Sequence, residues 1–210
     1  MSFLRSTKGR LGILIGIATL ALFAFLLVGI SVSILQRQST SRLARRFVGI
    51  VPVPAASVDG TWVLYRDVLT RWEDIDHSLA IATPVAGQQP RSVAELHQEA
   101  YEQLIRETYL RRQAEKERFA LSEAIVQQNL ERVLLGGATS TPELLAQATQ
   151  DLADHVGWTI DTFRDRIIRP ATLEEALALR AEVTGMTREA WLQQVQTFLG
   201  SGSVKRYLNF

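Results

Sequence analysis

The sequence predicts a mainly α-helical protein, with an N-terminal transmembrane helix followed by a multi-helix domain that contains one small β-hairpin. Three observations support this prediction. Residues 11–35 carry no charged side chain, and a helix needs about 20 apolar residues to cross the hydrocarbon core of a bilayer. From residue 65 onward, apolar side chains recur with helical spacing. An Asp-Gly pair at 59–60 lies between two short apolar runs, which is typical of a two-residue hairpin turn.

The amino-acid composition excludes several classes of chemistry. The 210 residues include no cysteine, so disulfides, thiolate metal sites and thiol nucleophiles are excluded. The formal net charge is +1, but residues 1–35 hold three basic and no acidic side chains, which leaves 20 basic and 22 acidic residues in the remainder. A slightly acidic body argues against nucleic acid as a partner, because neutralising phosphates requires clustered Lys and Arg.

The uncharged segment 11–35 is predicted to be a retained membrane anchor. The alternative is a cleaved signal peptide, whose apolar region is about 7–15 residues long and ends in a small-residue cleavage site. This segment is longer, and the sequence SVSILQRQ (31–38) at its end is a poor cleavage site. Residues 1–10 are then predicted to be a cytoplasmic N-terminus. Charge alone leaves the orientation open, because basic residues lie on both sides of the span: Arg5, Lys8 and Arg10 before it, and Arg37, Arg42, Arg45 and Arg46 after it.

Residues 36–54 are predicted to be a basic, proline-containing linker. Its basic side chains could lie against anionic lipid headgroups, but a solvated flank is the preferred interpretation. Pro52 and Pro54 resist both helix and central strand. The folded body is therefore predicted to be a single domain over residues 55–210, beginning with strands at 56–58 and 61–64.

The rest of the body reads as a series of helices with recognisable ends. The first starts at Tyr65 and stops before Pro84. Ser92 and Glu95 form a capping box that opens the second, and a third starts after Ser122. Thr141 followed by Pro142 opens a fourth, because proline at the first helical position loses no hydrogen bond.

The segment around Trp158 joins two predicted helices. Gly157 closes one helix and Thr159 caps the next. Trp158 is placed to pack against Phe163 as a hydrophobic staple. Pro170 is expected to kink or restart the helix, and further helices are predicted at about 172–184 and 188–199.

No catalytic constellation is visible in the sequence. His77, His97 and His155 lie on three different predicted helices without metal-ligand spacing. Nucleophile-elbow, Walker and dinucleotide-binding motifs are absent, and the glycines at 200–202 lack the preceding strand and following helix of a phosphate loop. We therefore predict no enzyme activity, no catalytic residues, no metal and no cofactor. An enzyme would require the three histidines to converge with carboxylates in space.

The aromatic residues are the remaining candidates for a binding site. They fall on or beside apolar faces, where core packing is the default, but as a set they could line a groove that binds apolar segments. The candidate client-binding residues are Trp62, Trp72, Trp158, Phe163 and Trp191.

Three segments in a fixed order resemble a known family. They are AASVDGTWVLYRDVLTRW (55–72), AYEQLIRETYLRRQAEKERFALSEAIVQQNL (100–130) and HVGWTIDTFRDRIIRPATLEEAL (155–177). Together they resemble the N-terminal domain of SurA-like chaperones, which also occurs in the membrane-anchored foldases PpiD and PrsA. The resemblance covers roughly residues 55–180.

The resemblance implies a single-pass protein of the plasma membrane, with its N-terminus in the cytoplasm and its C-terminal domain outside. Its implied partners are unfolded or nascent exported proteins held in an apolar groove, membrane lipid through residues 11–35, and the export machinery. Typical members continue into a parvulin-type prolyl isomerase domain, for which the residues after Leu179 are too few. Isomerase activity is therefore not carried over, and residues 187–210 are expected to complete the core. The alternative is a non-catalytic scaffold that uses the same groove for one dedicated partner.

Overall fold

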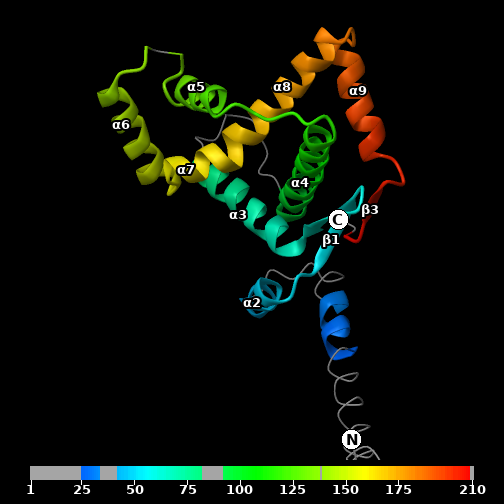
Figure 1. Cartoon of the computed structure of the whole chain (residues 1–210). Helices are drawn as coiled ribbons and strands as arrows, with labels where there is room; N and C mark the ends of the chain where they lie inside the picture. The colour runs from blue at the N-terminus through cyan, green and yellow to red at the C-terminus, as the bar shows by residue number, and fades with distance from the viewer. Residues whose placement is uncertain (1–24, 34–41, 82–91, 138, 209–210) are drawn as a thin grey trace, which may run out of the picture.

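The computed structural model describes residues 25–33, 42–81, 92–137 and 139–208 (Figure 1). The mainly helical prediction is confirmed, and residues 25–33 are also helical. The remaining elements are α2 (Arg42–Ile50), β1 (Pro54–Val58), β2 (Thr61–Leu64), α3 (Tyr65–Ile81), α4 (Val93–Lys116), α5 (Glu123–Leu134), α6 (Pro142–Asp151), the π-helical turn η2 (Leu152–Val156), α7 (Ile160–Phe163), the π-helical turn η3 (Arg164–Ile168), α8 (Arg169–Val183), α9 (Arg188–Leu199) and β3 (Val204–Arg206).

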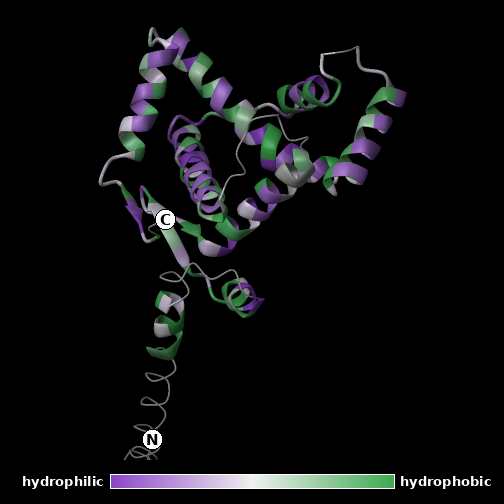
Figure 2. Cartoon of the chain, turned by 180° about the vertical axis from the view of Figure 1, so that it is seen from behind, coloured by the Kyte–Doolittle hydropathy of each residue, from purple (hydrophilic) through white to green (hydrophobic). Residues whose placement is uncertain are grey.

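The predicted transmembrane segment lies largely outside the described residues. Of residues 11–35, the structure describes only 25–33, a helical stretch whose side chains are mostly hydrophobic (Figure 2). Phe25, Val28 and Ile30 are exposed there. Within the described part of the chain, no helix combines the length and apolar character needed to cross a membrane. Residues 1–10 also lie outside the description, so the anchor and its orientation stay predictions.

The predicted hairpin is confirmed, and the structure adds a third strand to it. Asp59 and Gly60 both have positive φ, 50° and 82°, as a two-residue turn that matches the twist of the strands requires. β3 pairs antiparallel with the other side of β1, so the strand order is β2-β1-β3. The prediction of a hairpin alone was wrong, since the hairpin is part of a three-stranded sheet. β3 was not predicted because a strand of three residues that pairs with a distant segment leaves no local sequence pattern.

Residues 42–53 pack on the body and are not simply the basic, proline-containing linker expected for 36–54. Helix α2 buries Ala44 and Val48, and Val53 is equally buried. Arg45 forms an ion pair with Glu73 of α3, and the Val53 carbonyl accepts a hydrogen bond from the Tyr65 amide at 2.8 Å. Ala44 and Val48 therefore pack on the body, and only part of this stretch faces water.

The main core lies between the sheet and helices α3, α4, α8 and α9 (Figure 1). The Tyr101 hydroxyl, on α4, donates a hydrogen bond to the Ala55 carbonyl at 2.9 Å. Tyr109 stacks on Phe198 of α9, with ring centroids 4.1 Å apart. Leu208, past β3, is buried in the same core. The C-terminal segment thus completes the core, as the family resemblance implied.

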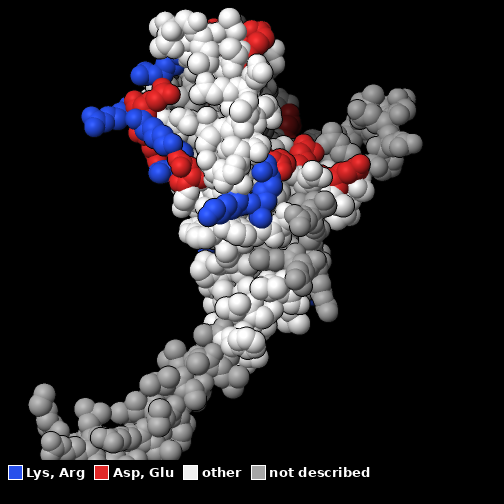
Figure 3. Space-filling view, turned by 90° about the vertical axis from the view of Figure 1, so that its right-hand side faces the viewer, with Lys and Arg blue, Asp and Glu red and all other residues white. Residues whose placement is uncertain are grey.

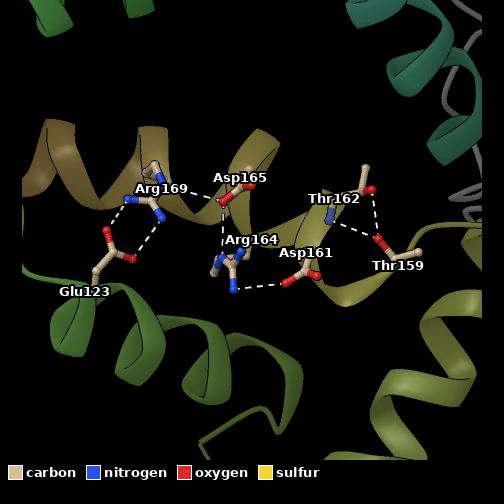
Figure 4. Close-up of polar contacts among 7 residues, drawn as sticks. All are labelled: Glu123, Thr159, Asp161, Thr162, Arg164, Asp165 and Arg169. Carbon is tan, nitrogen blue, oxygen red and sulfur yellow. Dashed lines mark hydrogen bonds and ion pairs between the residues drawn. The ribbon is translucent and has the colours of Figure 1, made fainter.

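A smaller core joins α5 to α7 and η3. Val126, Leu130 and Ile168 are buried there, with Phe163 packed against them. On the surface of the same junction, Figure 4 shows Arg169 forming two hydrogen bonds to the Glu123 carboxylate, at 2.5 and 2.8 Å. This arrangement holds α5 against the α7–η3–α8 segment.

Pro170 lies in the first turn of α8, so an α-helical element begins at the expected place. The chain runs from α7 through η3 into α8, and the Arg169 amide donates to the Arg164 carbonyl five residues earlier. The wider π-helical turn is a known way to accommodate a locally disrupted helix. The helix therefore restarts as α8 at the expected position, directly after a π-helical turn.

Candidate functional site

An open apolar groove of about 420 Å³ lies between α3, α4 and the η2–α7–η3 segment. We call it the Trp158 groove. Its apolar lining consists of Ile75, Leu152, Val156, Trp158, Phe163 and Ile167, and its polar rim consists of Arg71, Asp74, Glu99 and Gln103.

Local sequence places Trp158 and Phe163 side by side in this groove. Gly157 ends η2 in the left-handed conformation at φ 67°, which a glycine adopts without steric cost. The Thr159 hydroxyl oxygen then accepts a hydrogen bond from the Thr162 amide at 3.2 Å and caps α7 (Figure 4). The chain turns between the two elements, and the centroids of the Trp158 and Phe163 rings lie 6.3 Å apart. The staple contact predicted from the sequence is confirmed.

One end of the groove is formed by a buried charge network. Arg71 Nη2 contacts Glu107 Oε1 at 2.6 Å, and Arg166 pairs with the buried Asp74. Arg71 Nη1 donates to the Arg166 carbonyl at 3.1 Å. That carbonyl lies four residues before Pro170, which has no N–H to donate to it. Because Pro170 cannot donate to the Arg166 carbonyl, this oxygen is available to accept the hydrogen bond from Arg71.

Burial and neighbouring charges shift the pKa of Glu107 in opposite directions. Burial raises the pKa of its carboxyl group, while the neighbouring Arg71 and Arg111 lower it. Among the described residues, the second carboxylate oxygen has only the Arg111 guanidinium nearby, at 3.6 Å. Arg71 also borders two other cavities, of about 540 and 270 Å³, whose linings are more polar than that of the Trp158 groove. The apolar groove thus ends in a charged region that can bind polar groups.

The structure brings together only two of the five candidate client-binding residues. Trp158 and Phe163 share the groove, and both are half-buried. Trp62 is exposed on β2, borders the 540 Å³ cavity and stacks on Tyr207. Trp191 lines a separate pocket of about 270 Å³ between α4, α8 and α9. Trp72 packs edge-on against His97, with their ring centroids 4.5 Å apart.

Sequence reasoning did not identify Arg71 as a functional residue. The signal was present, because Arg71 lies three residues after Val68 and four before Ile75, which places a charge on the apolar face of α3. Leu152 and Val156 are four residues apart and so share an apolar stripe of their helical segment. That this stripe lines an open groove is decided by packing.

The histidines do not form a shared site in the described part of the chain. His97 is buried on α4, and burial lowers the pKa of its imidazole. His155 is exposed on η2 and bonds the Asp151 carbonyl of its own helical segment at 3.0 Å. The side chain of His77 lies outside the description. Among the described residues, no group of three or more potential ligands is placed to hold a metal ion.

Comparison with known families adds an independent observation. A family model described as the SurA-like N-terminal domain matches residues 1–134. The match contains the two resembling segments at 55–72 and 100–130, begins well before residue 55 and ends before the third segment. The comparison found no family of catalytic domains, and curated proteins and solved structures gave no match. Because the matched region is more than half of the chain, the chain belongs to the family of SurA-like N-terminal domains.

Proposed function

We propose that this protein is a membrane-anchored extracytoplasmic chaperone that binds unfolded or partly folded exported proteins without catalysis. The observation that carries the proposal is the Trp158 groove, where two half-buried aromatic rings line an open apolar surface. Domains of the SurA N-terminal family bind unfolded client proteins. An apolar groove with a polar rim is the surface that such binding requires.

Client binding would depend on the partial exposure of the groove. An apolar client side chain that docks against Trp158, Phe163 and Ile167 leaves water, and full burial of one such side chain contributes about 1.5–3 kcal/mol. Association and ordering of the chain offset much of this gain. The groove would therefore bind many sequences weakly and release them without ATP. The Arg71 end offers charged and polar partners for the client backbone.

The anchor and the location belong to the same proposal. Residues 11–35 would span the plasma membrane, with residues 1–10 in the cytoplasm and the body outside. The proposal is supported by the absence of charge over this segment and by the exposed apolar side chains of residues 25–33. Orientation follows the family resemblance. The export machinery is a further partner, because the body would stand close to the site where clients emerge.

The second candidate function is a scaffold that holds one dedicated partner. The observation that favours it is the uncharged stretch 190–204, which includes most of α9. Figure 3 views the molecule from this side and shows uncharged surface down the middle of its upper part, with charged side chains to the left of it. Depletion of charge is typical of the centre of a stable protein interface.

Suppression of aggregation by the isolated body tests the chaperone function. The body must include α2, because Ala44 and Val48 belong to the core, so it comprises residues 42–210. We expect it to suppress light scattering by a denatured model client at near-stoichiometric ratio. Ile167→Gln should weaken suppression, since Ile167 lines the groove. Leu179→Gln is the matched control, because Leu179 is an exposed apolar residue on α8.

The result separates the two functions. Suppression that Ile167→Gln weakens and Leu179→Gln leaves intact supports client binding in the Trp158 groove. Equal suppression by both variants would move the client site elsewhere on the body. If a folded body does not suppress aggregation, the chaperone function is wrong. The scaffold is then tested by copurification of a single protein in fixed ratio with the full chain.

A further inference from the structure

Helix α2 carries an exposed face that its packing against the body does not use. Ala44 and Val48 point into the core, whereas the side chains of Leu43 and Ile50 are 78% and 84% exposed. Leu43 and Ile50 are seven residues apart and so lie on one face of the helix. Arg46, between them on the same side, is also exposed.

Arg42 extends this face by one turn. It lies four residues before Arg46, and both side chains face solvent. The unused face of α2 thus combines two large apolar side chains with two cations. Helices that lie in the interface of a membrane have this composition, since the apolar side chains enter the acyl boundary and the basic ones reach anionic headgroups.

The position of α2 in the molecule fits such a contact. Figure 1 places α2 at the end of the body from which helical residues 25–33 extend. In that view α2 is seen nearly end-on while residues 25–33 run along the page, so the two helices lie crosswise. A helix along the membrane normal would therefore place α2 roughly in the membrane plane.

Chain length keeps α2 near the bilayer surface. Eight residues, 34–41, separate the two helices, and a fully extended chain of that length spans about 30 Å at most. We infer that α2 is an interfacial helix that lies on the outer leaflet of the anchoring membrane and binds anionic lipid through Arg42 and Arg46. This inference rests on the proposed anchor at residues 11–35.

The contact would orient the chaperone body. α7, which carries Phe163, lies above α2 on the left of the body in Figure 1, away from residues 25–33. With α2 held on the membrane, the Trp158 groove would face the aqueous phase. The body would then be attached to the membrane at two points, the anchor and α2, and its groove would remain accessible to clients.

Site-specific labelling tests the contact, because the chain has no cysteine and each introduced cysteine is unique. The full chain is reconstituted in vesicles of phosphatidylcholine with a minority of phosphatidylglycerol. An environment-sensitive fluorophore is attached to Leu43→Cys, Ile50→Cys or the control Val183→Cys. Val183 is 88% exposed at the end of α8. Collisional quenching by nitroxide groups on the lipid acyl chains is measured, and flotation of each preparation checks the anchor.

We expect quenching at positions 43 and 50 to be several times that at 183. Adding Arg42→Glu and Arg46→Glu should reduce quenching at 50, and so should vesicles without phosphatidylglycerol. Equal quenching at all three positions in protein that floats with the vesicles would overturn the α2 contact and leave the anchor intact. Protein that does not float refutes the anchor itself. Fluorophore protection at 43 and 50 without lipid quenching would identify a protein partner instead and would also overturn the inference.

Discussion

Replacing Arg71 by methionine should destabilise the body more than any single surface change. Arg71 and Glu107 are only 9% and 12% exposed, and their charged atoms lie 2.6 Å apart. Methionine keeps much of the aliphatic volume but removes the guanidinium. The Glu107 carboxylate then stays buried with only Arg111 at 3.6 Å, and the Arg111 side chain is 62% exposed.

The expected loss follows from leaving one buried charge without its partner. Removing one member of a buried ion pair costs about 3–5 kcal/mol, and an ion pair with an exposed side chain recovers less than about 1 kcal/mol of it. The Arg166 carbonyl also loses its hydrogen bond from Arg71. We therefore expect Arg71→Met to lower the free energy of unfolding by about 3–5 kcal/mol near neutral pH.

The loss should depend on pH with a defined sign. Burial raises the pKa of Glu107 in the folded protein above 4.5, and Arg71 opposes that shift, so the substitution should raise it further. Between the unfolded and folded pKa values, the folded state binds more protons than the unfolded state, and stability falls as pH rises. The deficit of Arg71→Met should accordingly shrink as pH falls toward the unfolded pKa.

Urea denaturation of the body, followed by tryptophan fluorescence at neutral and mildly acidic pH, measures both effects. The double variant Arg71→Met/Glu107→Gln should be more stable than Arg71→Met alone, because it no longer buries an unpaired charge. A loss below about 1 kcal/mol at neutral pH, the range of surface ion pairs, would refute the reasoning. So would a deficit that stays constant with pH.

Three further predictions concern the groove and the sheet. Phe163→Ala should lower the free energy of unfolding, measured by urea denaturation, by about 2–3 kcal/mol. This is less than the ~3–5 kcal/mol of a fully buried ring, because Phe163 is only half-buried. A loss near zero would mean that the ring makes no contact with Val126 and Leu130. Gly157→Ala should cost about 1–2 kcal/mol in the same assay, since its φ of 67° is left-handed, and an unchanged midpoint would contradict the turn. Removal of residues 204–210 deletes β3 and the buried Val204 and Leu208, and the burial of each of these side chains contributes about 1.5–3 kcal/mol of stability. Thermal unfolding followed by circular dichroism should therefore show a lower midpoint. An unchanged midpoint would show that the third strand is dispensable.

Local signals in the sequence predicted the helices and their ends well. The Ser92–Glu95 capping box, the Thr141–Pro142 start and the left-handed Gly157 are all present in the structure. These features depend on backbone groups within a few residues of each other, so the sequence contains all the partners. The same locality explains why the contact between Trp158 and Phe163 could be predicted.

Features that depend on distant residues were not predictable in this way. Arg71 finds its partners on α4 and η3, β3 pairs with a strand from the other end of the body, and α2 packs on α3. The five aromatic candidates share one local property, an apolar neighbourhood, and the structure distributes them over separate surfaces.

The sequence by itself determined the mainly helical fold, the hairpin turn, the helix ends and the family. Hydrogen bonds between near neighbours and the periodicity of apolar residues carry that information. Only the tertiary structure decided that Trp158 and Phe163 border an open groove, and that the buried Arg71 lies at one end of this groove. Whether an apolar side chain is covered or exposed depends on how distant elements pack, and no local pattern encodes that.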